Sequence, residues 1–117
     1  MDAAQTIRAL SALAQDHRLA AFRMLVQAGE PGMAAGALAE ALAVPASSMS
    51  FHLAQLSNAG LITQRRQSRS IIYAADYAEM GALMGYLTEN CCGGGASCAP
   101  VVCAPTQERP TQERNVA

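Results

Sequence analysis

Four cysteines are concentrated near the carboxyl end of this 117-residue chain. Cys91 and Cys92 are adjacent, Cys98 follows after a glycine-rich stretch, and Cys103 lies five residues further on. Glycine imposes little steric restriction on the backbone, so the run Gly93–Gly95 allows the first three sulfurs to converge on one atom. Adjacent cysteines rarely bridge each other without strain, which favours a chelating pair over a disulfide pair.

The donor set of this cysteine cluster selects among metals and metalloids. Trivalent arsenic is thiophilic and takes three thiolates in a pyramid, which Cys91, Cys92 and Cys98 can supply, and antimony(III) is a related ligand. Zinc usually recruits four nitrogen or sulfur ligands; no histidine lies nearby, although Cys103 is available as a fourth sulfur for zinc or cadmium. The alternatives are a redox pair, in which Cys91 or Cys92 bridges Cys98 or Cys103, and incidental thiols in a tail. We rank arsenic first and redox second.

Positive charge is concentrated in one place, although the chain as a whole is not basic. The formal net charge is −1 and there is no lysine, yet Arg65, Arg66 and Arg69 fall within five residues of one another. Such a group can bind phosphate or enter a minor groove, and the alternative is a solvated hairpin with ordinary charges. Three arginines with no acid beside them favour DNA.

Two helices are expected to open the chain. Ile7, Leu10 and Ala14 recur at helical spacing in the first. Asp16 can cap the second, whose apolar face is formed by Leu19, Phe22, Leu25 and Val26. The sequence G-E-P-G at 29–32 then predicts a turn, because proline cannot continue a helix and glycine accepts unusual dihedral angles.

The next segment has the spacing of a helix-turn-helix motif. An alanine-rich helix over 35–42 and a tight connection at 43–44 precede a second helix from Pro45 or Ala46 to about Asn58. Met49, Leu53 and Leu56 form one apolar stripe of that helix, which is expected to face the core. The outer side carries Phe51 and the candidate DNA contacts Ser47, Ser48, Ser50, His52 and Gln55. The hydroxyls suit phosphates and base edges near the helix N-terminus, and glutamine can pair with adenine. His52 can donate to a phosphate. Capping or solvation of the serines and a structural role for the histidine are the alternatives.

Two short strands and a last helix complete the pattern. Residues 61–67 and 70–74 contain β-branched side chains around a polar turn, which predicts a hairpin wing. The turn over 67–70 lacks the glycine of a tight hairpin, so we expect a wider or mobile tip. The helix over 77–90 carries Met80, Leu83, Met84 and Leu87 on one face. Gly81 and Gly85 would let another helix approach closely, which predicts a dimer helix.

Composition agrees with these elements. About half of the residues are apolar and only five are aromatic, which favours a mainly α fold with a small β-hairpin wing. A chain of this length has room for one domain that completes its burial by dimerising. We expect a winged helix-turn-helix DNA-binding and dimerisation domain at 1–90, a cysteine-rich metalloid-binding segment at 91–103 and a disordered tail at 104–117, where PTQER occurs twice.

The start of the chain bears on the compartment. The first residues include Asp2 and lack the roughly 18 apolar residues in a row that export or membrane insertion would need, so we expect a cytoplasmic protein with no membrane partner. In that reducing compartment, clustered cysteines point to metal, metalloid or redox chemistry before structural disulfides.

The order helix, turn, helix, two-stranded wing and final helix resembles the ArsR/SmtB family from about Ala3 to Asn90. The segment MSFHLAQLSNAGLI, residues 49–62, is similar to that family's recognition helix and its exit. The resemblance implies a homodimeric winged helix-turn-helix repressor bound to double-stranded operator DNA. In the arsenic-responsive type, DNA would be released when Cys91, Cys92 and Cys98 bind trivalent arsenic.

The family senses arsenite, antimonite, zinc, cadmium or lead through sites placed independently on one scaffold. Two of its patterns are missing here, because residues 35–44 contain no cysteine and the last helix contains no histidine for a zinc site. A thiol-based redox sensor and a zinc or cadmium sensor of the same fold are the alternatives. We do not expect an enzyme, because no oxyanion loop is joined to a nucleophilic cysteine.

Overall fold

The computed structural model describes residues 1–94, and the statements below concern these residues. They belong to two compact units, Met1–Leu87 and a second unit that begins at Thr88. The predicted metalloid-binding segment lies partly outside the described residues, and the predicted tail at 104–117 lies wholly outside them.

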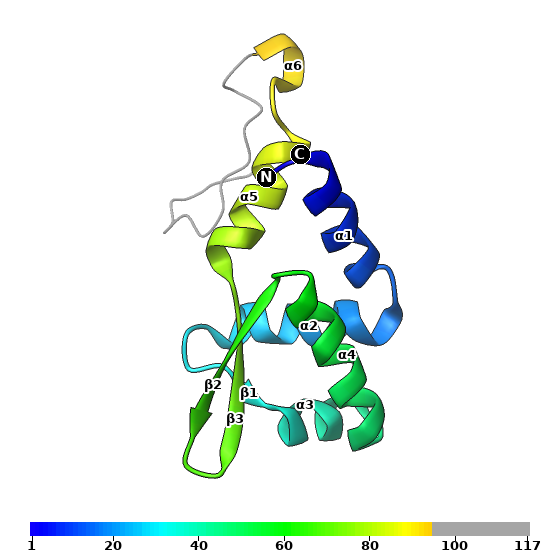
Figure 1. Ribbon diagram of the computed structural model, residues 1–117, viewed down its shortest axis with the longest axis vertical. Coiled ribbons are helices and arrows are strands. Elements are labelled where there is room, and N and C mark those ends of the chain that lie inside the picture. Colours follow the sequence, from blue (N-terminus) through cyan, green and yellow to red (C-terminus); the bar gives the residue numbers. More distant parts are fainter. Residues whose placement is uncertain (95–117) are drawn as a thin grey trace, which may run out of the picture. The chain divides into compact units, whose positions relative to one another are not determined.

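The first unit contains five helices and a three-stranded sheet (Figure 1). In chain order its elements are α1 (Ala3–Leu13), α2 (Asp16–Ala28), β1 (Met33–Ala34), α3 (Ala35–Leu42), α4 (Ala46–Asn58), β2 (Ile62–Gln67), β3 (Ser70–Ala75) and α5 (Tyr77–Leu87). This is the predicted winged helix-turn-helix order. The predicted helix-turn-helix pair corresponds closely to α3 and α4, whereas α5 ends three residues before the predicted position 90.

Local hydrogen bonds explain where the first two helices begin. Asp2 and Gln5 form a capping box, in which each side chain accepts a hydrogen bond from the other residue's backbone N–H, at 2.8 and 2.9 Å. The cap of α2 is Gln15, whose side chain accepts from the backbone N–H of Arg18 at 3.0 Å. The prediction of Asp16 as the cap is therefore wrong by one position, although its carboxylate still lies in the first turn, where the helix dipole favours it.

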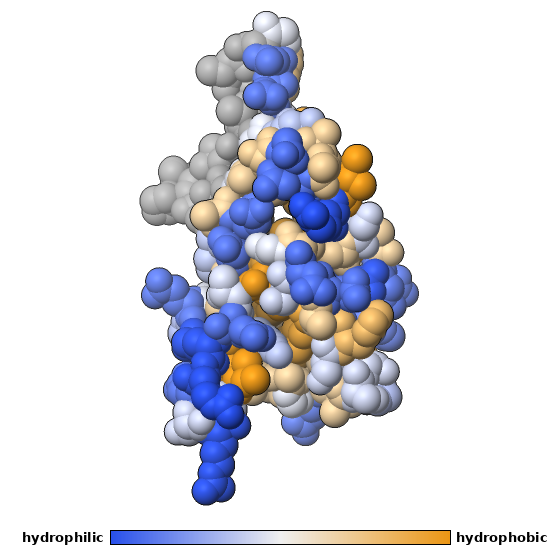
Figure 2. Space-filling view, viewed as in Figure 1, coloured by the Kyte–Doolittle hydropathy of each residue, from blue (hydrophilic) through white to orange (hydrophobic). Residues whose placement is uncertain are grey.

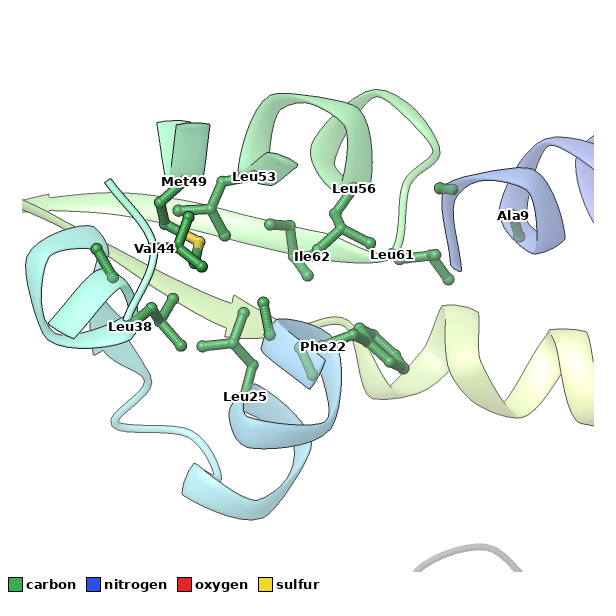
Figure 3. Packing of buried hydrophobic residues seen from close by; sticks show 14 of the residues in the cluster. Ala9, Phe22, Leu25, Leu38, Val44, Met49, Leu53, Leu56, Leu61 and Ile62 are labelled. Atoms are coloured by element: carbon green, nitrogen blue, oxygen red, sulfur yellow. The ribbon is translucent and has the colours of Figure 1, made fainter. Parts of the chain in front are cut away.

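The hydrophobic core lies between α2, α3, α4 and the start of β2. Figure 3 shows side chains from these elements pointing toward one another. The predicted core stripe of α4 is confirmed, because Met49, Leu53 and Leu56 are almost fully buried. They pack in one cluster with Phe22, Leu25, Leu38, Val44, Leu61 and Ile62.

The face of α1 that packs on the core is not the face that carries its large apolar residues. Its buried residues are Thr6, Ala9 and Ala12, whereas Ile7 is 64% exposed and Leu10 is 42% exposed. Alanine has a small side chain that lets helix backbones come close, so the alanine face packs on the domain. The larger apolar side chains remain on the opposite side.

The sheet differs from the predicted two-stranded hairpin in two respects. A third strand, β1, pairs antiparallel with β3 through Met33 and Tyr73, which gives the order β1-β3-β2. The expectation of a wider turn is wrong, because Gln67 pairs with Ser70 and only two residues connect the strands. Ser68 supplies the left-handed backbone, with φ of +57°, at a cost of about 1 kcal/mol relative to glycine.

Helix α5 is attached to the helical part of the first unit at its first residue and near its middle. The Tyr77 hydroxyl donates to the Val26 carbonyl oxygen of α2 at 2.8 Å, and Leu83 is buried. In the second unit, α6 (Cys91–Gly94) begins with a hydrogen bond from the Cys91 N–H to the Thr88 carbonyl oxygen at 2.9 Å. Positive φ angles of 58° at Asn90 and 56° at Cys92 curve this backbone sharply.

Candidate DNA-reading surface and cysteine cluster

The outer face of α4 is opposite the core stripe. With about 100° of rotation per residue, Phe51 points directly away from the mean direction of Met49, Leu53 and Leu56. Phe51 is 58% exposed, and Ser47 and Ser50 are also exposed. Ser48 and Gln55 are half-buried. The structure thus places the predicted serines and Gln55 on the accessible sides of one helix, while their contacts with DNA stay a prediction.

The beginning of α4 is open to an anion. Pro45 occupies the N-cap and makes no side-chain hydrogen bond to the helix. The first backbone N–H groups of a helix have no partner within the helix, and the dipole gives this end a partial positive charge. Together with the hydroxyls of Ser47 and Ser48, this end can receive a phosphate oxygen.

His52 lies on the flank of α4 that faces α2. Its ring centroid is 5.5 Å from that of His17 and 6.0 Å from that of Phe51. Its Nδ1 atom is buried and has no hydrogen-bond partner among the described residues. Burial, followed by the positive charges of Arg18 and His17, lowers the pKa of His52 below its usual 6.5. The side chain is therefore neutral at neutral pH. The contact of His52 with a phosphate stays a prediction.

The three wing arginines have different surroundings. Arg65 donates from Nη2 to the Pro31 carbonyl oxygen at 2.9 Å and from Nη1 to that of Glu30 at 3.3 Å, so it ties β2 to the loop after α2. Arg66 and Arg69 are exposed and form no hydrogen bond within residues 1–94. Figure 2 shows strongly hydrophilic side chains gathered over the wing strands. Arg66 and Arg69 thus have all of their N–H groups available to a phosphate, whereas Arg65 has two of its five N–H groups bonded to backbone carbonyl oxygens.

The described part of the cysteine cluster contains two of the predicted ligands. Cys91 is a half-buried free thiol, and Cys92 is disulfide-bonded. Cys98 and Cys103 lie outside the described residues. Residues 1–94 bring together no group of three cysteine, histidine or acidic side chains that could hold a metal ion. A three-thiolate site at Cys91 and Cys92 would thus need a ligand from the remaining chain.

A pocket of about 330 Å³ beside α4 was not anticipated from the sequence. It is lined by Arg8, Ser11, Ala12, Arg18, Gln55, Asn58 and Ala59. These residues come from the consecutive helices α1 and α2 and from the far end of α4, which follows much later in the sequence, so no local pattern marks them. A second pocket, of about 640 Å³, is open to solvent beside the wing and includes Glu30, Arg65 and Tyr77.

The helix-turn-helix pair, the wing and the exposed face of α4 define a winged helix-turn-helix DNA-binding regulator. A family model described as a helix-turn-helix domain matches residues 13–65. The chain is 32% identical over 90 residues to the HTH-type transcriptional regulator YgaV of Escherichia coli, covering 77% of this chain and 89% of YgaV.

Solved structures agree with this classification. An ArsR-like transcriptional regulator from a Rhodococcus species is similar with a TM-score of 0.65 at 26% identity, covering 72% of this chain and 76% of that one. A homodimeric winged helix-turn-helix DNA-binding domain from Mycobacterium bovis is similar with a TM-score of 0.58 at 28% identity, covering 74% and 80%. The chain belongs to the ArsR/SmtB family of transcriptional regulators. These relatives are regulators, which confirms the prediction that the chain is not an enzyme.

Within the described part of the chain, no helix combines the length and apolar character required to cross a bilayer.

Proposed function

We propose that this protein is an arsenic(III)-responsive repressor. It binds operator DNA as a homodimer and dissociates when Cys91, Cys92 and Cys98 bind arsenic(III). The observation that carries the proposal is the adjacent pair Cys91–Cys92, placed four residues after the last residue of α5 on sharply curved backbone. Soft thiolates are the ligands that trivalent arsenic prefers, and the glycines after the pair allow a third thiolate to reach the same atom.

Exposed apolar side chains support dimerisation through the terminal helices. Ile7 and Leu10 on α1 are exposed, and so are Tyr86 and Leu87 on α5, where Leu87 is 56% exposed. The two helices contact each other within the first unit. Space is open where Cβ atoms at Gly81 and Gly85 would stand. A second copy of the chain would remove this apolar surface from water, and the similar domain from Mycobacterium bovis is homodimeric.

The geometry of the dimer explains how a ligand at the cysteines would change DNA binding. Two recognition helices must lie about 34 Å apart to enter successive major grooves on one side of a duplex. The cysteine pair follows α5 directly in sequence, and α5 is a proposed dimer helix. A change in how α5 packs when three thiolates close on arsenic would alter the spacing of the two α4 helices and weaken DNA binding.

The test is fluorescence anisotropy of a labelled fragment of the gene's own upstream DNA. The experiment uses a phosphine reductant, because arsenic(III) binds thiolates and a dithiol reductant would compete for it. Arsenite should release the wild type and should leave the Cys91→Ser/Cys92→Ser/Cys98→Ser variant bound, with Cys103→Ser as the matched control that behaves like wild type. Unchanged release of DNA from the triple variant would refute the assignment. A change in arsenite-driven release that is seen only in Cys103→Ser would mean that the arsenic site includes Cys103 instead.

The disulfide-bonded state of Cys92 favours a second candidate, a thiol-based redox sensor. Two thiols and one molecule of hydrogen peroxide give one disulfide and two molecules of water, and that cross-link would replace arsenic as the signal. Separate samples therefore receive peroxide or zinc in place of arsenite. Release by peroxide alone, reversed by reductant, would select the redox sensor, and release by zinc alone would select a zinc site that includes Cys103.

A further inference from the structure

The pocket beside α4 is cationic. Arg8 comes from α1 and Arg18 from the first turn of α2, and no acidic residue lines the cavity. The other polar groups in its wall are the Ser11 hydroxyl and the side-chain amides of Gln55 and Asn58. All five side chains can donate hydrogen bonds, which is the composition expected of an oxyanion site.

The arginine charges are not neutralised by neighbouring carboxylates. Arg18 donates from Nε to the Ala12 carbonyl oxygen at 2.6 Å, which fixes the guanidinium and leaves its terminal N–H groups for another acceptor. Neither Arg8 nor Arg18 forms an ion pair within residues 1–94. The charge of Arg18 also reaches His52, where it contributes to the lowered pKa of that imidazole.

The pocket borders the face of α4 that is expected to read DNA. Gln55 and Asn58 lie one helical turn apart, and both fall within about 40° of the direction of Phe51. A major groove is about 12 Å wide and an α-helix with its side chains is about 10–12 Å in diameter, so the phosphates of the groove walls lie along the flanks of the helix. The pocket extends from this outer face to Arg8 of α1 and Arg18 of α2, so its two arginines lie beside α4, where backbone phosphates run, and away from the base edges.

We propose that Arg8, Arg18, Ser11 and Asn58 form a phosphate-binding pocket, and that its occupant is the operator's sugar–phosphate backbone. Guanidinium groups bind phosphate oxygens in a bidentate manner, and the hydroxyl and amide add neutral donors. Such a contact fixes the position of α4 without reading sequence. This inference rests on the DNA-binding part of the proposed function and is independent of the inducer.

The test is the salt dependence of DNA binding by Arg8→Gln, measured in the full-length protein by anisotropy between about 50 and 200 mM salt. The variant should lose about three- to tenfold in affinity on operator and unrelated DNA alike. The slope of log affinity against log salt should become shallower by about 0.9 for each phosphate that the variant no longer neutralises. Arg23→Gln is the matched control, because Arg23 is an exposed α2 arginine outside the pocket. Sedimentation checks that both variants keep the oligomeric state of wild type.

The outcomes separate the two proposals. If wild type binds no DNA, the proposed function fails. If wild type binds and Arg8→Gln has the same slope as Arg23→Gln, the backbone-phosphate assignment is overturned. A free oxyanion is the other occupant that this pocket could hold, and a thermal-shift titration of the DNA-free protein with inorganic phosphate tests for it. If phosphate stabilises wild type but not Arg8→Gln, and the salt slope of DNA binding is unchanged in the variant, the occupant is a free oxyanion. That result would also overturn the assignment.

Discussion

Replacing Gly32 by alanine tests whether the loop before β1 positions the wing. Gly32 has φ of +69°, and an added Cβ would collide with the Tyr73 carbonyl oxygen in β3 and lie 3.0 Å from Cγ2 of Ile72. The left-handed conformation costs a non-glycine residue about 1–2 kcal/mol. The collision is with main chain, so relief requires movement of the sheet, with a typical overpacking cost of about 1–3 kcal/mol. We expect a stability loss of about 2–5 kcal/mol.

Two further Gly→Ala changes serve as controls because they separate these terms. At Gly60 φ is +82°, but the nearest atom is 3.7 Å from the added Cβ, so only the conformational cost of about 1–2 kcal/mol applies. At Gly36 in α3 nothing lies within 4 Å, and alanine should stabilise the helix by up to about 1 kcal/mol.

Urea unfolding followed by circular dichroism, at one protein concentration, measures all three variants. If Gly32→Ala loses no more stability than Gly60→Ala, the collision argument is refuted. A normal DNA affinity for folded Gly32→Ala would show that the wing does not depend on this contact.

Three other predictions concern single side chains. Tyr77→Phe should lose about 1 kcal/mol in urea unfolding, because the hydroxyl donates to Val26 at 2.8 Å; an unchanged midpoint would contradict this. Burial, then Arg18, lowers the pKa of His52, so this residue's contribution to stability is present above pH 6.5 and is lost as the pH falls below it. His52→Gln should flatten the stability profile there, and an unaltered profile would disprove the assignment. Phe51→Ala should change stability by less than about 0.5 kcal/mol, because the side chain is 58% exposed. We expect Phe51 to contact the methyl group of a thymine in the operator, so replacing that thymine by uracil should cost wild type about fourfold in affinity and Phe51→Ala nothing.

The helix-turn-helix pair could be predicted because its signals are local. A repeat of apolar residues three and four apart placed Met49, Leu53 and Leu56 on one face, and Pro45 marked the start of α4. Strand β1 could not be predicted in this way, since Met33 is held by pairing with Tyr73, forty residues later. The apolar pattern of α1 also did not predict which of its sides is buried, because the helix packs on the domain through its alanines and not through its larger apolar side chains.

The functional surface was predictable in its residue types but not in its contacts. The wing arginines were identified from their clustering, yet only the fold reveals that Arg65 is occupied by the carbonyl oxygens of Glu30 and Pro31. The cationic pocket could not be predicted from the sequence, because Arg8 and Arg18 form a pocket only where the fold brings α4 beside them.

In the mechanism that we propose, α5 is the element through which arsenic bound at the cysteines acts on DNA. Its first residue, Tyr77, is hydrogen-bonded to the last turn of α2, and the preceding Asp76 N–H donates to the Leu61 carbonyl oxygen at the entrance of the wing at 2.9 Å. A displacement of α5 would therefore act on both the helical core and the wing. Thermodynamic linkage then requires that operator DNA weaken arsenite binding by the same factor by which arsenite weakens DNA binding. Arsenite titrations with and without operator measure that factor, and equal affinities would mean that release does not proceed through a coupled equilibrium.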